Sequence, residues 1–217
     1  MLSLILTLAA ASAAPALPGD GTYTYVSSMN GATIGKTAIT VKHDPDGIVL
    51  NEQGGGSFNG RQGTVTDTLT LDPQLDPKGF VLNANVDGRA VNTRISFSGT
   101  GASQTGDLAE KTYGLAAGAK HFVVLDMGPF SGWFALPAQM QAWSGTPACA
   151  IVPEMGYNVT IAPDASAKSE RPPTVPPGDS AINVSSPMPF TLWFQPSTML
   201  VDRVDFPTQG VSVVRQP

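Results

Sequence analysis

Gly128-Pro129-Phe130-Ser131-Gly132-Trp133-Phe134-Ala135-Leu136-Pro137-Ala138-Gln139-Met140-Gln141-Ala142-Trp143 is the densest group of large apolar side chains in this sequence. These side chains recur at steps of three and four residues, which is the spacing of one helix face. Pro129 suits a first helical position, and Gly145 suits a helix end. The segment therefore predicts a short apolar helix that packs against a sheet. The helical spacing is carried by Phe130, Trp133, Phe134, Met140 and Trp143.

Pro137 lies inside this predicted helix. A proline in a helix interior costs about 3 kcal/mol or more, because it removes a backbone hydrogen bond and clashes with the preceding turn. Burying four or five large side chains yields roughly 1.5 to 3 kcal/mol for each one. Burial outweighs the proline, so we expect a kinked or two-part helix rather than none.

The most regular strand pattern lies earlier in the chain, at Phe80–Asp87 and Val91–Phe97. Both segments alternate apolar and polar residues, and Asp87-Gly88-Arg89-Ala90 connects them. Strict alternation indicates that one face of the sheet is buried and the other is exposed to solvent, which is typical of an antiparallel sheet. The side chains that we expect to point inward are Phe80, Leu82, Ala84, Val86, Val91, Ile95 and Phe97.

Further turns and strands extend this pattern over the chain. Asn30-Gly31 is a strong hairpin signal between two strand-like runs, and Asp44-Pro45-Asp46-Gly47 is a second turn. We interpret the glycine-rich segment 54–60 as a flexible connection and 100–118 as a loop or sheet edge. The remaining predicted strands are 65–71, 121–126, 148–152, 157–161, 181–184, 190–194, 200–206 and 211–215. The sequence thus predicts a mainly β fold: a single strongly curved antiparallel sheet, a half-barrel or open barrel, wrapped around one short kinked aromatic helix.

The N-terminus predicts export. Residues 2–13 form an uncharged apolar run that ends in Ala11-Ser12-Ala13, a small-x-small pattern suited to signal peptidase. We therefore divide the chain into a signal peptide (1–13), a linker (14–21) and a single β-rich domain (22–217) with a proline-rich loop (163–178). The expected location is secreted, in a bacterial periplasm. No apolar run reaches the roughly twenty residues of a membrane helix, so we expect no transmembrane segment in the mature chain.

Composition excludes some partners. The formal net charge is -5, and the basic residues are scattered rather than gathered in a stripe, so we expect no nucleic-acid binding. Cys149 is the single cysteine; it lies in an apolar strand and is typical of a small core residue. Two histidines and one cysteine do not supply a zinc site, and no cofactor is predicted.

The order of the predicted strands and helix resembles that of a known type of domain. It rests on Gly21-x-Tyr23-x-Tyr25, on Gly35 after the first turn, on Val123-Val124-Leu125-Asp126 leading into the aromatic helix, and on the closing segments 192–194 and 204–207. This layout resembles uncharacterised bacterial secreted half-barrel domains of the lipoprotein-carrier type. The resemblance implies a strongly curved antiparallel sheet around helical plugs. It carries over no functional residue.

Catalytic patterns are weak. No G-x-S-x-G motif is present, and only His43 and His121 could serve as a base. Cys149 could pair with either histidine, and the spacing does not decide this. A glycosidase interpretation would use two carboxylates among Asp126, Glu154, Asp202 and Asp205. We therefore predict no enzyme, and a hydrolase with an unrecognised site is retained as an alternative.

The leading hypothesis is a secreted, non-enzymatic domain that binds a lipid or another apolar small molecule, such as an acyl chain, in the concave face of the sheet. Its evidence is the excess of large apolar side chains near the predicted helix, although these side chains could equally fill the half-barrel. The alternative is an interaction or accessory domain for another secreted protein, which would use the proline-rich loop and a sheet edge. The candidate ligand-binding residues are Phe130, Trp133, Phe134, Met140, Trp143 and Trp193.

Overall fold

The computed structural model describes residues 16–217, except positions 59, 109, 127 and 129, and omits the side chain of Phe58. The predicted signal peptide, residues 14 and 15 of the predicted linker, and Pro129 thus lie outside the described residues. Within the linker, Leu17 and Pro18 are buried, and Leu17 belongs to the hydrophobic core.

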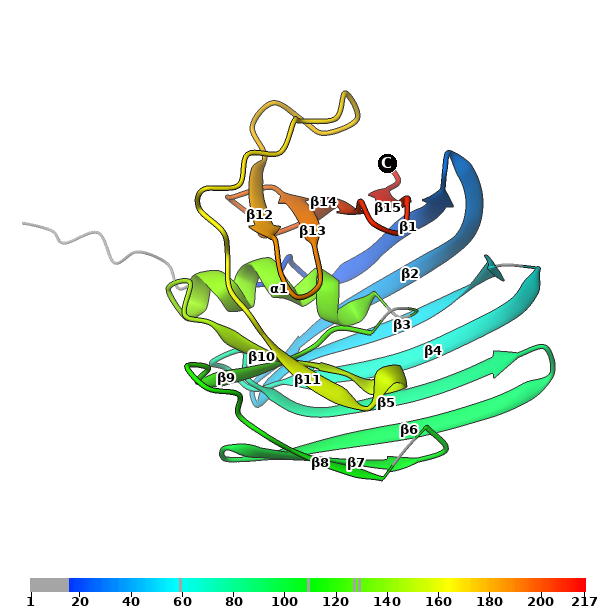
Figure 1. Ribbon diagram of the computed structural model, residues 1–217, viewed down its shortest axis with the longest axis vertical. Helices are drawn as coiled ribbons and strands as arrows, with labels where there is room; N and C mark the ends of the chain where they lie inside the picture. Colours follow the sequence, from blue (N-terminus) through cyan, green and yellow to red (C-terminus); the bar gives the residue numbers. More distant parts are fainter. Residues whose placement is uncertain (1–15, 59, 109, 127, 129) are drawn as a thin grey trace, which may run out of the picture.

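A 12-stranded antiparallel sheet forms the body of the protein and is not closed (Figure 1). Its order is β12-β13-β14-β15-β1-β2-β3-β4-β5-β6-β7-β8. The mainly β fold with one open, curved antiparallel sheet and one short helix is confirmed. The strands are β1 (Gly21–Met29), β2 (Ala32–Asp44), β3 (Gly47–Phe58), β4 (Arg61–Leu71), β5 (Pro77–Val86), β6 (Arg89–Ser98), β7 (Gly101–Gly106), β8 (Lys111–Gly114), β12 (Ser180–Val184), β13 (Phe190–Phe194), β14 (Val201–Phe206) and β15 (Val211–Arg215).

The two ends of the described chain meet inside this sheet. The last strand, β15, pairs antiparallel with β1 from Tyr25 opposite Arg215 to Met29 opposite Val211. The buried hydroxyl of Tyr25 also donates a hydrogen bond to the carbonyl of Val201 on β14, at 2.8 Å. The four C-terminal strands therefore extend the sheet beyond β1 rather than forming a separate layer.

A second sheet has the order β11-β10-β9, with β9 (His121–Val124), β10 (Ala148–Val152) and β11 (Tyr157–Ile161). The sequence predicted a single sheet, so this second sheet was not expected. β9 and β10 pair in parallel, and parallel strands need a crossover connection, usually a helix. Helix α1 (Ser131–Ala142) supplies that crossover, and the short 3-10 helix η1 (Pro153–Met155) joins β10 to β11.

Helix α1 lies within the concave side of the large sheet (Figure 1) and runs through Pro137 as one helix, not two. All ten residues from 131 to 140 are buried. A helix that is apolar on every side is stable only when it is enclosed. The concave sheet and the C-terminal strands provide this enclosure, which explains why Pro137 is tolerated.

Two predicted loops are instead strands. The glycine-rich segment 54–56 lies inside β3, where the β2 and β3 backbones approach closely. A Cβ atom on Gly56 would lie 2.1 Å from the carbonyl oxygen of Ile34, and one on Gly54 would lie 2.7 Å from Oγ1 of Thr37. These glycines therefore permit close strand approach rather than flexibility. The segment 100–118, interpreted as a loop or sheet edge, contains β7 and β8, and β8 forms one edge of the large sheet.

Candidate functional site

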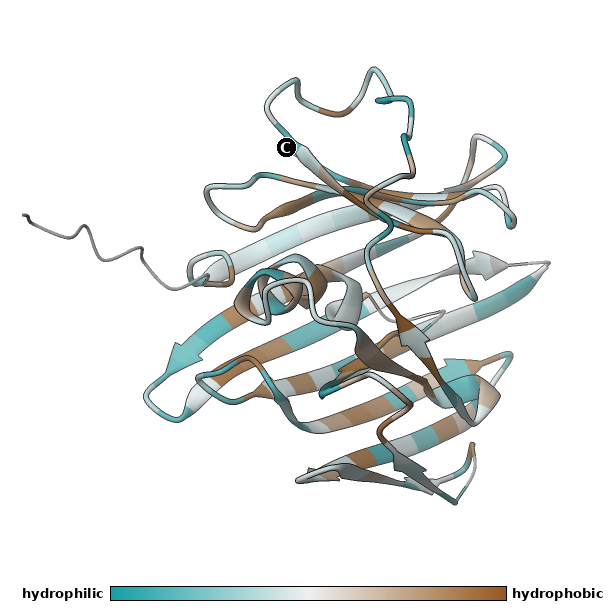
Figure 2. Ribbon diagram, turned by 60° about the vertical axis from the view of Figure 1, so that its left-hand side comes forward, coloured by the Kyte–Doolittle hydropathy of each residue, from teal (hydrophilic) through white to brown (hydrophobic). Residues whose placement is uncertain are grey.

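The inner face of strands β3 to β6 is arranged in rows that cross the sheet. Each row consists of residues that are direct cross-strand partners. The alternation along the strands that produces these rows can be followed in Figure 2. Beginning beneath α1, the rows are Leu50-Leu69-Phe80-Ile95, then Glu52-Asp67-Leu82-Thr93, then Gly54-Val65-Ala84-Val91, and finally Gly56-Gly63-Val86-Arg89.

These rows change in character along the strands. The first is a fully apolar core row, and the second is just as buried but contains Glu52, Asp67 and Thr93. We call the second row the polar belt. The third and fourth rows consist mostly of glycine and small apolar residues and are half-buried, apart from the exposed Arg89. We call these two rows the small-residue floor.

The length of α1 explains the boundary between the belt and the floor. Its 12 residues span about 18 Å, whereas the 12 residues of β3 span about 40 Å. The C-terminal end of α1 is fixed near the β4–β5 turn, where Gln139 Nε2 donates to the carbonyl of Leu75 at 2.9 Å. Its N-terminal end reaches the polar belt, so the floor lies beyond the helix.

Glu52 anchors the N-terminal end of α1. Its Oε2 atom accepts the backbone N–H groups of Phe130 at 2.5 Å and Ser131 at 2.7 Å, and its Oε1 atom accepts the hydroxyl of Thr37 at 2.6 Å. Phe130 itself makes no side-chain capping bond. The first N–H groups of a helix need acceptors and attract negative charge. A carboxylate from the sheet therefore replaces a local helix cap.

Asp67 lies directly opposite Glu52 and is 3% exposed. Its carboxyl group pairs with the carboxyl of Glu52 and with the hydroxyl of Ser131. Burial, followed by the charge of Glu52, raises the pKa of Asp67 from its ordinary value of 3.8 to about 9. Burial also raises the pKa of Glu52, although its four hydrogen-bond donors oppose that shift. The pair therefore holds a proton at neutral pH.

A second pair of carboxyls adjoins the first. Asp126 is 2% exposed, and its pKa is raised well above the ordinary value by burial and by Glu154. Its Oδ1 atom accepts the N–H of Gly128 at 2.9 Å, and its carboxyl group also hydrogen-bonds to that of Glu154. The charge of Asp67 also acts on Asp126. Four carboxyls thus converge at the N-terminal end of α1.

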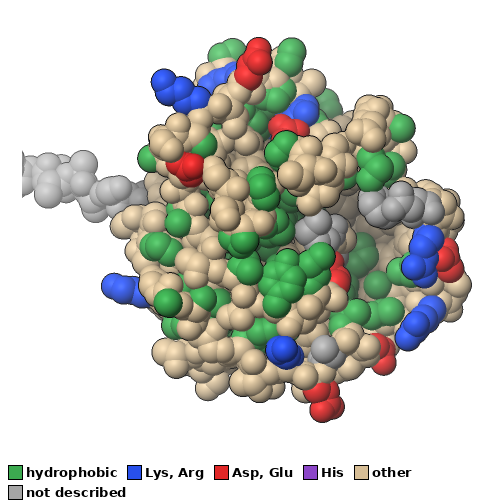
Figure 3. All heavy atoms as spheres, in the orientation of Figure 1, with side chains coloured by type: hydrophobic (Ala, Val, Ile, Leu, Met, Phe, Trp, Pro, Cys, Tyr) green, Lys and Arg blue, Asp and Glu red, His purple; other side chains and the backbone are tan. Residues whose placement is uncertain are grey.

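Space is left beside this cluster. Figure 3 shows a hollow on the face seen in Figure 1, with hydrophobic side chains in its walls and an acidic side chain inside it. The hollow lies toward the hairpin ends of β2 to β5, where α1 does not cover the small-residue floor (Figure 1). The buried polar belt therefore lies between the apolar core row beneath α1 and the half-buried small-residue floor.

Five of the six predicted ligand-binding residues belong to the core between α1 and the sheet. Each is at most 7% exposed, and each contacts protein rather than open space. Trp133 makes edge-to-face contacts with Phe190 and Phe206, both at 4.9 Å between ring centres. These aromatic side chains act as a structural plug. The five residues are Phe130, Trp133, Phe134, Met140 and Trp143.

Trp193, the sixth predicted residue, is separated from the other five. It is buried but is not part of the core cluster beneath α1, which includes its neighbours Phe190 and Leu192 on β13. Arg171, from the proline-rich loop, lies over its ring at 5.6 Å. Trp193 thus packs on the outer face of the sheet, because successive residues of a strand point to opposite faces.

The histidines and the cysteine do not come together. His43 and His121 hydrogen-bond to Asp20 and Asp76, at 2.6 and 2.7 Å. Cys149 is fully buried, as predicted for a core residue. Its direct partner on β9 is Phe122, so its side chain points to the face opposite that of His121.

The predicted carboxylates separate into two groups. Asp126 and Glu154 join the cluster near the belt, whereas Asp202 and Asp205 lie on β14. Nε of Arg215 donates to Asp202 at 2.6 Å, and Nε of Arg203 donates to Asp205 at 2.8 Å. The β14 carboxylates are therefore neutralised by arginines and belong to a different part of the sheet.

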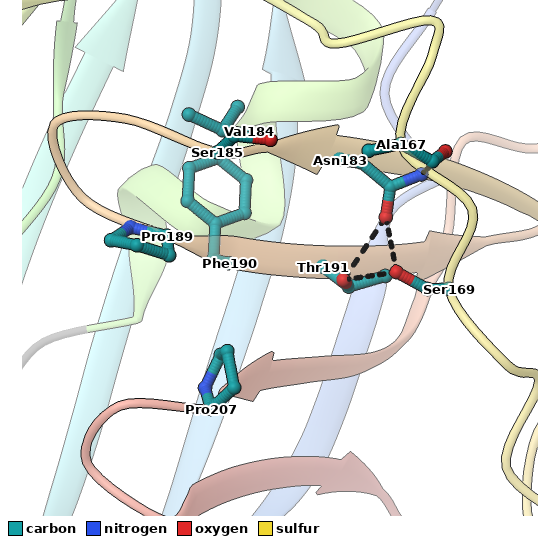
Figure 4. Close-up of a pocket in the computed structure, with 9 residues that line it drawn as sticks. All are labelled: Ala167, Ser169, Asn183, Val184, Ser185, Pro189, Phe190, Thr191 and Pro207. Atoms are coloured by element: carbon teal, nitrogen blue, oxygen red, sulfur yellow. Dashed lines mark hydrogen bonds between the residues drawn. The ribbon is translucent and has the colours of Figure 1, made fainter.

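A separate pocket of about 280 Å³ lies at the end of the β12–β13 hairpin (Figure 4). Its polar corner is formed by Ser169, Asn183 and Thr191, which hydrogen-bond to one another at 2.6 to 3.0 Å. Phe190 and Pro207 contribute apolar walls. These polar atoms satisfy one another.

Glu52 and Asp67 were not among the predicted site residues, although a signal for both is present in the sequence. Leu50 and Leu69 are apolar residues of alternating strands, and side chains two residues apart share a face. This alternation carries the two carboxyls to the same inward face. The carboxyls chosen from the sequence were instead those expected at turns and strand ends.

Among the described residues, no group of three or more His, Cys, Asp or Glu is arranged to hold a metal ion. None of the helices described is both long and apolar enough to span a membrane.

Comparisons with known proteins give a distant structural similarity. No family model matches the sequence, and no curated protein matches it. A crystal structure of a DUF1089-family protein from Pseudomonas aeruginosa is similar, with 12% sequence identity and a TM-score of 0.49, over 80% of this chain and 90% of that chain.

Proposed function

We propose that this protein is a secreted, non-enzymatic domain that holds an apolar ligand on the small-residue floor, with the polar end of the ligand at the belt. The single observation behind this proposal is the half-buried inner face beyond α1, which borders the buried carboxyl pair of Glu52 and Asp67. Sites for small ligands combine a mostly apolar cleft with a few convergent polar groups. The proposed ligand would thus lie on the rows beyond α1, not against the aromatic side chains of the helix.

The composition of the floor supports this role. Gly54 and Gly56 permit the close approach of β2 and β3, whereas Gly63 carries no side chain and Ala84 only a methyl group, so little side-chain volume covers this part of the concave side. A sheet that served only as a scaffold would gain stability from a larger apolar side chain at a position such as Ala84. Small residues there instead leave room for a ligand.

Titration with Nile red, a neutral apolar dye, tests the proposal. We expect saturable binding, and we expect Ala84→Phe to weaken it by about 10-fold or more, because a ring would occupy the floor. Asn83→Phe is the matched control, since Asn83 is the exposed neighbour on the opposite face and should leave binding unchanged. Absence of saturable binding, or an equal effect of the two variants, would contradict the proposal.

A further inference from the structure

The proline-rich loop, residues 163–178, joins β11 to β12 and runs beside the C-terminal strands (Figure 1). The hydroxyl of Ser169 hydrogen-bonds to that of Thr191 on β13 at 2.8 Å. Nη1 of Arg203 on β14 donates to the hydroxyl of Thr174 at 2.8 Å. Val175, between these contacts and β12, is 4% exposed. The loop is therefore packed against the sheet rather than extended into solvent.

Asp179 follows the loop, directly before β12, and is 6% exposed. Its carboxyl group hydrogen-bonds to the carboxyl of Asp202 on β14. Within the loop, Nη1 and Nη2 of Arg171 donate to the carbonyls of Pro176 and Asp179, at 2.5 and 3.0 Å. The side chain of Asp179 thus joins the end of the loop to the sheet.

A hydrogen bond between two carboxyl groups needs one proton, because an ionised carboxylate can only accept. Asp202 already accepts Nε of Arg215 at 2.6 Å and Nε2 of Gln195 at 3.0 Å, so Asp179 is the group that carries the proton. Burial, followed by the contact with Asp202, raises the pKa of Asp179 from 3.8 to about 6. The positive charges of Arg171, in the loop, and Arg215, on β15, oppose this shift.

We propose that the pair of Asp179 and Asp202 is a pH-sensitive latch that holds the proline-rich loop closed in acid and releases it more often near neutral pH. Loss of the proton leaves two carboxylates side by side, and like charges at close range repel. The two arginines offset only part of this repulsion. The inference does not rest on the proposed function, because the latch and the small-residue floor lie on different strands.

Trp193 on β13 is the side chain that the closed loop covers. Its ring lies beneath Arg171, and it is 4% exposed. Its Nε1 atom makes no hydrogen bond with any described residue. A buried donor without an acceptor raises the free energy of the closed loop, and water would satisfy this donor when the loop opens. This cost favours opening, the latch opposes it, and opening would expose Trp193.

The direction of the pH effect follows from the two states of the loop. The pKa of Asp179 is about 6 in the closed loop and returns toward 3.8 when the side chain is solvated. The closed loop therefore binds the proton more tightly, so the latch is complete below about pH 4 and is lost as the pH rises through about 6. Between pH 5 and 7.5, the equilibrium constant for closing should fall about 10-fold.

Amide hydrogen exchange measures the opening of the loop. The N–H of Val175 donates to the carbonyl of Pro172 at 2.9 Å within the loop. Its protection factor, corrected for the intrinsic exchange rate at each pH, reports the opening equilibrium, and we expect it to fall about 10-fold from pH 5 to 7.5. Amides of the β5–β6 hairpin should be more strongly protected at both pH values. Equal protection of Val175 and the hairpin would show that the loop does not open by itself, which would overturn the latch.

Asp179→Asn keeps a hydrogen-bond donor for Asp202 but cannot titrate. In this variant, the protection of Val175 should stay nearly constant from pH 5 to 7.5, at the value of the unmodified protein at pH 5. Asp46→Asn, in the exposed β2–β3 turn, is the control and should retain the fall with pH. An equal fall in Asp179→Asn would refute the proposal. A flat profile in the unmodified protein would also refute it, and this measurement decides the question even if Asp179→Asn does not fold.

Discussion

The carboxylate of Glu52 on β3 accepts the backbone N–H of Ser131 at 2.7 Å, across 79 residues of sequence. This contact fixes the start of α1 against the sheet and places the helix end at the polar belt. It also brings a charged group into the interior, where its cross-strand partner Asp67 is held protonated. Glu52 thus positions the start of the helix, and its charge adds to the burial that raises the pKa of Asp67.

The stability of the protein should depend on the proton of Asp67. Its pKa is about 9 in the folded protein and near 3.8 when unfolded, so between these values the folded state binds more protons. Stability therefore falls as the pH rises through this window, by at most about 1.4 kcal/mol per pH unit for one proton. Asp67→Asn cannot titrate, so its stability curve should be flatter from pH 5 to 9. Urea unfolding at several pH values measures this, and an unchanged slope would show that Asp67 is not the titrating group.

Thr37 should contribute measurably to the anchoring of α1. Its hydroxyl donates to Glu52 at 2.6 Å in a buried position, and hydrogen bonds to charged groups contribute about 1.5 to 3 kcal/mol. Thr37→Val preserves the shape and removes the donor, so we expect a loss of that size in the free energy of unfolding. Thr33→Val, at an exposed position of the same strand, is the control. Similar losses for both variants would refute the specific role of Thr37.

Gly132 should not tolerate a side chain. A Cβ atom there would lie 1.7 Å from the carbonyl oxygen of Val124 on β9, so the backbone itself must move. We expect Gly132→Ala to cost about 1 to 3 kcal/mol or more, as overpacking does. Gly114→Ala, where no atom lies within 4 Å of the added Cβ, should be nearly neutral. Thermal unfolding of both variants measures the difference, and equal melting temperatures would contradict the close approach of α1 to β9.

Trp133 should be a major contributor to stability rather than to ligand binding. Its ring contacts Phe190 and Phe206, and its Nε1 atom donates to the carbonyl of Asp126 at 2.8 Å. Truncating a buried tryptophan to alanine costs about 3 to 5 kcal/mol. Trp133→Ala should therefore lower the free energy of unfolding by that amount, whereas Tyr157→Ala, at a position 41% exposed, should have a small effect. Chemical unfolding followed by circular dichroism tests both, and a tolerated Trp133→Ala would argue against the plug.

Local patterns in the sequence predicted most of the individual elements. Alternation at residues 80–97 gave the β5–β6 hairpin and its inward face, because side-chain direction in a strand depends only on position along the strand. Helical spacing likewise identified α1 to within a few residues. The segment 54–56 was wrongly predicted to be a flexible connection, although it is part of β3. Glycine is found both in flexible loops and where two backbones approach closely, so its presence did not distinguish the two.

The sequence by itself therefore determined the β-rich class, the hairpins, the apolar helix and, through alternation, the inward face that Glu52 and Asp67 share. Only the tertiary structure decided that β15 pairs with β1, that α1 ends at the belt and that the small-residue floor stays open. The physical reason is distance along the chain. Side-chain direction is set locally, whereas pairing between remote strands, burial and the pKa of Asp67 depend on which distant segments come into contact.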